Sequence, residues 1–291
     1  MSLTPEERKK WRQKLASLTD EDFLAMSETE FRARFRERVH HTLEIQMYAA
    51  AYRKQKLKSS QADYAKRLVN VWEKRGLSTD APEYRFAKTL IDFADKLANS
   101  DEVDLSCFAP APVTPEEEAA FTRIVMERRS VREYKDKVVP DEVIDKILNA
   151  GLWAAHSCNL QSIRYLVVRE SEVPGMFQGS DVPGGPVHIV ICQDMRVYEA
   201  NRFMPEKNIL LDAGAAGQNI VLAAFAYGLE SVWLTFNETS EIRQRLREYF
   251  KLPDYIEIVT YVDVGYGDQT PCPPYRNSVE DCVIGRTPLK E

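Results

Sequence analysis

The chain has 291 residues, 44% of them hydrophobic and 29% charged, with a formal net charge of −6, which is an ordinary composition for one large or two average folded domains. No apolar run approaches the roughly 20 residues that span a bilayer, and residues 4–10 are charged where a signal peptide is apolar, which predicts a cytoplasmic protein with no membrane partner. The five cysteines are scattered and none forms a Cys-x-x-Cys pair, so the sequence indicates neither a disulfide framework nor a metal site.

Residues 1–100 predict an all-helical N-terminal extension. Thr4 precedes Pro5, and an acid follows three residues after the threonine, which is the pattern of a capped helix that starts at residue 5. Gly76 fits the end of a helix that begins near Ser60. Apolar side chains recur at helical spacing in three stripes that must pack against something, and they include Phe31, Phe35, Val39, Leu43, Met47, Leu68, Trp72, Tyr84 and Leu90.

Residues 101–113 predict a linker, because they show no helical period and carry two prolines. The charge also changes near this point. Residues 1–115 hold 20 Lys and Arg against 18 Asp and Glu, a net of +2, which leaves 19 against 27, a net of −8, in residues 116–291. A second capped helix start, Thr114 before Pro115, opens the acidic part.

After the linker, predicted helices and strands are mixed. Helical patterns cover residues 115–129, 140–155, 205–227 and 239–250, and β-branched or aromatic runs of strand length cover 163–168, 187–192, 231–235 and 256–264. This mixture predicts an α+β or α/β sandwich. Residues 209–226 are apolar or small on nearly every face, so we expect a buried central helix in which Gly214 and Gly217 allow close packing.

Two short segments carry the chemistry. Arg128, Arg129 and Arg132 surround Ser130 at the end of the helix that begins near residue 115, and guanidinium forks suit phosphate oxygens. Thirty residues later, Ser157-Cys158-Asn159-Leu160-Gln161 offers hydroxyl and amide groups that can read the polar edge of a heterocycle. The alternative for the arginines is that they form surface ion pairs only.

Other ligand-binding signatures are missing from the sequence. It contains no Gly-x-Gly-x-x-Gly, no Gly-x-x-x-x-Gly-Lys-Ser/Thr and no His-Glu-x-x-His, which disfavours a Rossmann dehydrogenase, a P-loop enzyme and a zincin. Basic and aromatic residues do not alternate as they do in nucleic-acid-binding modules, so we expect no nucleic-acid partner.

In their order, these segments resemble the opening of the nitroreductase family of flavin-dependent oxidoreductases. The likeness continues in Asp212-Ala213-Gly214-Ala215-Ala216-Gly217-Gln218-Asn219, in the run from Ala223 to Trp233, and in Gly285-Arg286-Thr287-Pro288-Leu289, and it covers roughly residues 116–291. The resemblance implies a nitroreductase-like α/β/α sandwich with a central mixed sheet. This flavin-binding domain, residues 114–291, would follow the helical extension and the linker.

The resemblance also implies a cofactor site for FMN. Arg128, Arg129, Ser130 and Arg132 would contact the phosphate, the ribityl chain and the pyrimidine edge, with Arg286 returning to the phosphate. Ser157, Cys158, Asn159 and Gln161 would come from the other subunit of a homodimer, and the backbone at Leu234 and Thr235 would face N5 of the flavin. We expect Cys158 to fill space and not to act as a redox thiol, and we assign no catalytic side chain and no metal ligand.

Three departures from the family pattern affect the acceptor side. His156 stands where the family usually has proline, and Ser162-Ile163 follows the glutamine where Pro-Trp is common. Residues 174–185 form a loop with glycines and prolines in place of a longer helical stretch, so the pyrimidine contacts of that stretch have no counterpart that the sequence identifies.

The implied activity is transfer of hydride from NAD(P)H through FMN to a small electron-poor acceptor, a nitroaromatic or a quinone, by a ping-pong mechanism. Reductive dehalogenation and dehydrogenation occur on the same fold and stay open as alternatives. A further alternative is a flavin-binding redox sensor or scaffold, in which the helical extension binds a partner.

Overall fold

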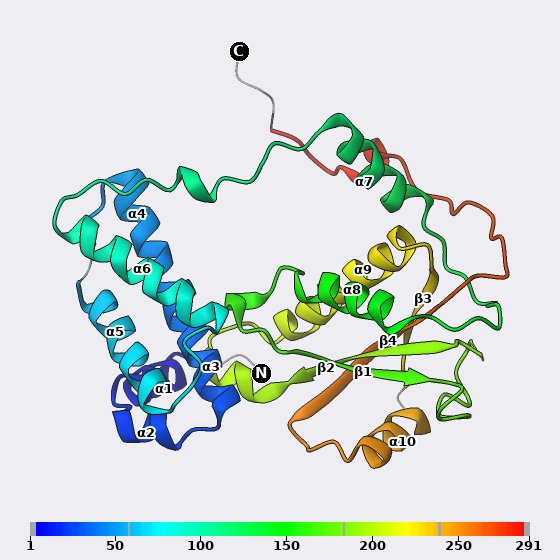
Figure 1. Cartoon of the computed structure of the whole chain (residues 1–291), viewed down its shortest axis with the longest axis horizontal. Helices are drawn as coiled ribbons and strands as arrows, with labels where there is room; N and C mark the ends of the chain where they lie inside the picture. The colour runs from blue at the N-terminus through cyan, green and yellow to red at the C-terminus, as the bar shows by residue number, and fades with distance from the viewer. Residues whose placement is uncertain (1–3, 58, 183, 238–239, 288–291) are drawn as a thin grey trace.

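The computed structural model describes residues 4–57, 59–182, 184–237 and 240–287. A group of helices from the N-terminal third lies beside a sheet-containing domain, and an extended segment joins the two along one side (Figure 1). Within the linker, residues 101–113, no side chain is buried, and the segment contains only the short 3₁₀ turn η2 (Ser106–Phe108).

The regular elements that the structure describes in residues 4–100 are all helices, as the sequence predicts. They are α1 (Pro5–Ala16), α2 (Asp20–Ala25), α3 (Glu28–Arg36), the π-helix η1 (Glu37–Glu44), α4 (Ile45–Arg53), α5 (Ser59–Lys74) and α6 (Pro82–Ala98). The predicted stripes meet in one core that includes Phe31, Phe35, Leu68, Trp72 and Tyr84. Burial of such side chains stabilises a fold by about 1.5–3 kcal/mol each, so this core holds the helices together.

The predicted helix boundaries at residues 5, 76 and 115 are confirmed. Thr4 and Thr114 both form full capping boxes, at the starts of α1 and of α7 (Pro115–Glu127) respectively. Gly76 has φ of 67°, a left-handed conformation that glycine adopts at low cost, and it follows the end of α5.

The sheet has four strands in the order β1-β2-β4-β3: β1 (Ile163–Arg169), β2 (Val187–Asp194), β3 (Glu230–Thr235) and β4 (Ile256–Gly265). All three neighbouring pairs are antiparallel, so the expectation of a mixed sheet is corrected for these strands. The reason is visible at β1 and β2, where Arg169 pairs with Val187 across a reversing loop. Among the described residues, parallel pairing occurs as an isolated bridge between Ser130 and Ser231.

Helices cover both faces of the sheet, which confirms the α+β sandwich (Figure 1). One face packs against α8 (Asp141–Leu152) and α9 (Lys207–Ala226) through a core that includes Ile147, Ile189 and Ile220. The other face packs against α10 (Glu241–Phe250) through a core that includes Leu246 and Tyr261.

Helix α9 is less buried than its sequence suggests. A Cβ at Gly217 would lie 2.6 Å from the Trp233 ring, which confirms close packing there, whereas Gly214 faces open space. Leu210 and Leu211 are 65% and 62% exposed. By length and composition α9 could cross a membrane, contrary to the expectation that no such run exists, but its Gly217 face packs on the sheet.

The extension contacts the sheet domain directly. Arg36, which is buried, donates a hydrogen bond from Nη2 to the carbonyl oxygen of Leu160 at 2.9 Å. Ala33 packs in a small core with Leu160 and Val197, the latter from the 3₁₀ helix η4 (Met195–Ala200). The extension therefore touches the chain next to the predicted Ser-x-Asn-x-Gln segment.

Candidate functional site

The arginine motif is attached to the start of strand β3. Arg128 is the C-cap of α7, and Ser130 forms a parallel bridge with Ser231. The Val131 N–H donates to the carbonyl oxygen of Ser231 at 3.1 Å. The backbone of the motif is thus fixed to the sheet, while the side chains of Arg128 and Ser130 are half-buried beside it.

No described carboxylate forms an ion pair with the guanidinium of Arg128 or Arg129, although the charge of Glu230 acts on both. Arg129 donates to the carbonyl oxygens of Met126 and Arg128, at 2.8 and 3.0 Å, and neither Arg128 nor Arg129 forms an ion pair with any described residue. Burial lowers the pKa of Arg128, and the charge of Arg276 adds to this effect, while Glu230 opposes it. Positive charge that lacks a carboxylate partner fits a bound anion such as a phosphate.

Arg276 is a member of this cluster that sequence reasoning missed. It lies in the C-terminal tail, far from the motif in sequence, and no pattern around it distinguishes it from other exposed arginines. Its charge acts on Arg128 because the tail passes the end of β4 and then the motif, where Gln269 Oε1 accepts the Arg132 N–H at 2.9 Å.

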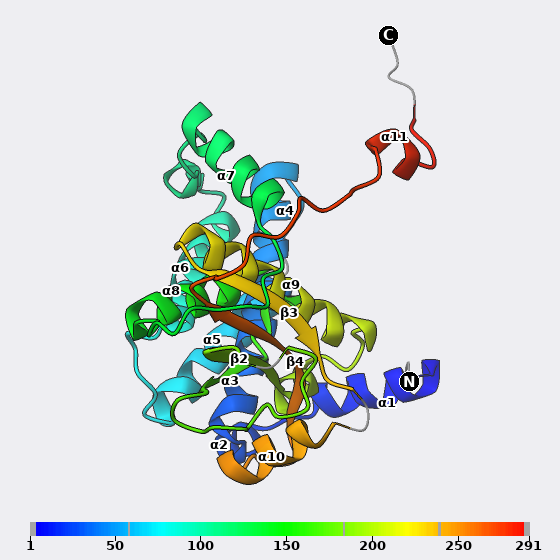
Figure 2. The same cartoon turned by 90° about the vertical axis from the view of Figure 1, so that its right-hand side faces the viewer.

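The other two predicted arginines are exposed. The Arg132 side chain makes no hydrogen bond or ion pair with the described residues. Arg286 lies beyond the short helix α11 (Val279–Cys282) in a tail that extends away from the rest of the chain (Figure 2). Arg286 is not among the charges that act on Arg128 in this chain, and its role at the phosphate stays a prediction. Pro288 and Leu289 of the predicted tail motif lie outside the described residues.

The second motif forms a tight turn with unusual backbone angles. Ser157–Asn159 is the 3₁₀ turn η3, and Cys158, Asn159 and Gln161 have φ of 50°, 51° and 58°. Left-handed conformations of residues other than glycine cost about 1–3 kcal/mol each and cluster at ligand sites. Surrounding contacts must hold this turn in place.

Asp212 of α9 provides those contacts. Its Oδ1 accepts hydrogen bonds from the Ser157 N–H at 2.9 Å and the Ser157 hydroxyl at 2.8 Å, and its Oδ2 accepts one from Tyr198 at 3.1 Å. Asp212 and Tyr198 are both buried. Sequence reasoning gave Asp212 no role, although a lone acid in an apolar helix is a signal that could have identified it.

His156, which replaces the usual proline, joins the same network as a neutral side chain. Its Nε2 accepts a hydrogen bond from the Ser162 N–H at 3.0 Å, and its Nδ1 lies 3.3 Å from Asp212 Oδ2. Burial lowers the pKa of His156, although the Asp212 charge opposes this shift. The hydrogen-bond pattern agrees with that direction, because a protonated Nε2 could not accept from Ser162.

The turn gives its side chains different burial and hydrogen bonds, as Cys158, Asn159 and Gln161 show. The Cys158 sulfur accepts a hydrogen bond from Asn201 Nδ2 at 3.4 Å, and burial raises the pKa of the thiol. A thiol with a raised pKa is a weak nucleophile, which agrees with a packing role. Gln161 donates to Asn159 Oδ1 at 3.1 Å, and Gln161 itself is exposed.

The predicted flavin-facing backbone lies at the end of β3. The Leu234 carbonyl oxygen accepts a hydrogen bond from the Thr260 hydroxyl, so this group is already engaged. Thr235 is exposed and pairs with Thr260 of β4.

The two motifs lie at opposite ends of α9 (Figure 1). The turn is tied to Asp212 near the start of the helix, whereas Arg123 of α7, just before the arginine motif, stacks over Phe225 near its end, at 5.8 Å from the ring centroid. At 1.5 Å per residue, these anchor points are about 20 Å apart along the helix axis. In a single chain, the arginine motif and the turn are therefore held at different places along α9.

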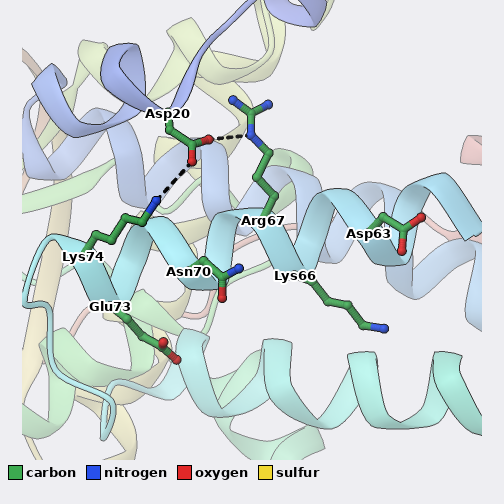
Figure 3. A pocket seen from close by; sticks show the side chains of 7 residues that line it. All are labelled: Asp20, Asp63, Lys66, Arg67, Asn70, Glu73 and Lys74. Atoms are coloured by element: carbon green, nitrogen blue, oxygen red, sulfur yellow. Dashed lines mark hydrogen bonds and ion pairs between the residues drawn. The ribbon is translucent and has the colours of Figure 1, made fainter.

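A hollow beside α5 is less suited to a ligand (Figure 3). Asp20 bonds to Arg67 at 2.6 Å and to Lys74 at 3.4 Å, and Lys66 pairs with Asp95. Because these charges are already paired and lie near the surface, they act as ordinary exposed ion pairs.

Comparison with known proteins identifies relatives of the sheet-containing part of the chain. The model of the nitroreductase family matches residues 125–178 and 177–266. The chain is 33% identical over 149 residues to a protein of Archaeoglobus fulgidus whose provisional name is NADH dehydrogenase/NAD(P)H nitroreductase, covering 50% of this chain and 83% of that protein. A protein of Methanothermobacter thermautotrophicus with the same provisional name is 31% identical over 149 residues, covering 50% and 75%.

A solved structure agrees on the fold. The nitroreductase-like protein of Streptococcus mutans superposes with a TM-score of 0.50 at 19% identity, and the match covers 58% of this chain and 99% of that one. The matched regions leave the N-terminal helices outside the shared domain, since the family model begins at residue 125.

Proposed function

Because this chain belongs to the nitroreductase family, we propose that it is an FMN-dependent oxidoreductase that passes electrons from NAD(P)H to a small electron-poor acceptor. The observation that carries the proposal is the cluster of Arg128, Arg129 and Arg276, in which no described carboxylate lies within ion-pair distance of Arg128 or Arg129. Guanidiniums in this arrangement suit the terminal phosphate of a mononucleotide.

The chain's own residues would bind and orient the cofactor. Arg128, Arg129 and Arg276 would hold the phosphate, with Arg132 at the pyrimidine edge, where a fixed positive charge stabilises negative charge on a reduced ring. The strained turn at Ser157, Cys158, Asn159 and Gln161 would supply hydroxyl and amide contacts. Its conformation is set in advance by Asp212, so these groups need little reordering when the cofactor binds.

When bound, FMN would supply two-electron chemistry, with NAD(P)H and the acceptor using the site in turn, as a ping-pong mechanism requires. No side chain of this chain needs to act as an acid or base in that scheme. Quinones and nitroaromatics are the acceptor class that we propose. Because NAD(P)H is a cytoplasmic reductant, we expect the protein to work in the cytoplasm.

We further propose that the working form is a homodimer. Asp212, which holds the turn, and Phe225, which contacts α7 just before the arginine motif, are about 20 Å apart along α9, so a second copy would bring one of each motif to the same flavin. Exposed apolar side chains support this proposal. They occur on α7, where no residue is buried, and on α9, and include Phe121, Met126, Leu210 and Leu211.

The direct test is to identify the cofactor and then measure turnover. The purified protein should be yellow, and heat should release FMN that is recognised by mass. Stopped-flow mixing should then show flavin bleaching by NADH or NADPH and recovery of the colour with a quinone. Release of FAD, or no flavin uptake when FMN is added, would reject the assignment. Binding of FMN without turnover would favour the redox sensor instead.

A further inference from the structure

A cavity lies between the helical extension and the Ser157–Asn159 turn. Its volume is about 770 Å³, within the range of about 300–1,000 Å³ that is typical of small-molecule sites. Helices α1, η1 and α5 form one side, and Cys158 with residues 201–208 forms the other. The cavity therefore joins a region outside the shared family domain to the turn that we assign to the flavin site.

Both sides of the cavity contribute aromatic and apolar side chains. Trp11 of α1 and Phe203 of the facing segment pack edge to face with ring centroids 4.6 Å apart, and Tyr64 of α5 lies under the Arg38 guanidinium at 5.0 Å. Leu15 and Met204 add apolar surface. Such a lining favours a flat, aromatic occupant, because stacking and edge contacts add to the burial of its surface.

The side of the cavity formed by α1, η1 and α5 carries a largely buried carboxyl group. Glu37 of η1 is 9% exposed and lines the cavity, and no described residue donates a hydrogen bond to its carboxyl oxygens, which are not fully shielded from solvent. The nearest cationic nitrogens, Arg38 Nε and His41 Nδ1, are each 3.9 Å away, beyond hydrogen-bond distance. Burial raises the pKa of Glu37, although the charges of Arg38 and His41 oppose this shift.

The backbone around Glu37 is also unusual. Residues Glu37–Glu44 form a π-helix, a conformation found in well under 1% of residues and often at functional sites. Glu37, Arg38, His41 and Thr42 of this segment all line the cavity. A largely desolvated carboxyl group that receives no hydrogen bond from the described residues can be stabilised by a ligand that donates one to it.

We propose that this cavity binds the electron acceptor, and that the acceptor is a planar aromatic molecule with an N–H or O–H group that donates to Glu37. The aromatic side chains hold the ring, Glu37 selects the donor, and Cys158 places the occupant against the turn. The acceptor role rests on the proposed flavin-dependent activity, whereas the binding of such a molecule does not.

Two matched probes test the selection by Glu37. The probes are 4-nitrobenzamide, which has an N–H donor, and methyl 4-nitrobenzoate, which has similar size and a nitro group but no donor. Titration calorimetry on the oxidised full-length protein, without NAD(P)H, measures binding in the absence of turnover. We expect 4-nitrobenzamide to bind about tenfold more tightly, since a hydrogen bond to a charged acceptor is worth that much or more. Equal dissociation constants for the two probes would overturn the proposal.

Variants test whether the preference between the probes depends on Glu37 and whether both probes bind in this cavity. Glu37→Leu should abolish the preference between the probes, while Glu37→Gln, whose amide oxygen still accepts, should keep part of it. Ser60 is exposed and lines the cavity, so Ser60→Trp should block both probes without disturbing the core. Ser106→Trp, the same change at an exposed position in the linker, is the control. A preference that persists in Glu37→Leu, or unaltered binding in Ser60→Trp, contradicts the site.

A kinetic comparison tests the acceptor role. In Ser60→Trp, kcat/KM for 4-nitrobenzamide should fall at least tenfold while the rate with ferricyanide, a small inorganic acceptor, is kept. If binding is blocked but 4-nitrobenzamide is reduced as before, the cavity does not serve the acceptor and the proposal is wrong. If the protein binds no FMN, the proposed function fails, and the calorimetric result still decides whether the cavity selects its ligand through Glu37.

Discussion

Asp212 accepts two hydrogen bonds from Ser157, one from its backbone N–H at 2.9 Å and one from its hydroxyl at 2.8 Å. The two residues are 55 positions apart, and their contact ties the central helix to the turn that we assign to the flavin. A buried carboxylate thereby holds a backbone segment in left-handed conformations that it would not adopt alone.

Replacing Asp212 with Asn removes the charge to which Ser157 and Tyr198 donate. Hydrogen bonds to a charged group contribute about 1.5–3 kcal/mol, so Asp212→Asn should lower the free energy of unfolding by about 2 kcal/mol and weaken FMN binding. Urea denaturation and FMN titration measure the two effects. Asp145→Asn, an exposed change on α8, is the control, and equal behaviour of the two variants would show that Asp212 does not support the turn.

Acid should weaken the same network through His156. Burial places its folded-state pKa below the value of about 6.5 expected in the unfolded chain. Between the two values the unfolded chain binds the proton and the folded one does not, so the contribution of His156 is fully present above pH 6.5 and is lost as the pH falls. Thermal melts from pH 8 to 5 should show this slope, and His156→Asn should reduce it. The same slope in both proteins would exclude His156 as its source.

The phosphate assignment is tested by pairing Arg128→Ala with a second change in the tail. Loss of two charge-assisted hydrogen bonds at about 1.5–3 kcal/mol each should weaken FMN binding on the order of a hundredfold or more. Arg276→Ala should weaken FMN binding further in the presence of Arg128→Ala, because the two arginines belong to one cluster. Arg286→Ala should weaken FMN binding only if the C-terminal tail reaches a flavin site. Lys88→Ala, at an exposed position on α6, is the control. Full FMN affinity in both double variants would place the phosphate elsewhere.

A charge on the exposed face of α9 should disrupt the dimer. Leu211 is 62% exposed, and Leu211→Lys would put an ammonium group into the proposed interface, where an unpaired buried charge is costly. Light scattering should then report a monomer of about 33.4 kDa that has lost FMN. Val138→Lys, at a position that is 79% exposed, should stay dimeric. A flavin-loaded monomer of the unmodified protein would refute the split site.

Removing the extension should damage the flavin domain. A chain that begins at Ala111 lacks the hydrogen bond that Arg36 donates to the Leu160 carbonyl oxygen. It also exposes Leu160 and Val197, which pack against Ala33 in the full chain. We expect lower solubility, weaker FMN retention and a broader choice of acceptors. FMN affinity and reduction of a small and a bulky quinone measure these effects. Identical values with and without the extension would make it a separate module.

Local structure could be predicted from the sequence because its causes are local. The capping threonines at 4 and 114 fix two helix starts, and β-branched runs give the four strands nearly to the residue. The prediction of a mixed sheet is wrong for these four strands, because the direction of strand pairing depends on contacts between distant segments. The exposure of Leu210 and Leu211 was also missed, since an apolar helix does not reveal whether its own chain or a second copy covers it.

The site was predicted less completely than the fold. Arg128 and the Ser157–Gln161 turn stand in recognisable motifs, but the residues that act on them do not. Asp212 and Arg276 reach them from 55 and 148 positions away, and only the folded chain shows these approaches. The π-helix at Glu37 likewise leaves no clear pattern, because its sequence has the spacing of an ordinary amphipathic helix.

The separation of the two motifs along α9 has a genetic consequence. If each flavin site takes its arginines from one subunit and its turn from the other, a chain with Arg128→Ala and a chain with Asp212→Ala are each defective in both sites of their own homodimer. In a mixed dimer, however, both defects fall in one site and the other site is wild type throughout. Co-expression of two inactive alleles should therefore restore activity, with one flavin in each hybrid, and intragenic complementation would reveal the shared site without any structural measurement.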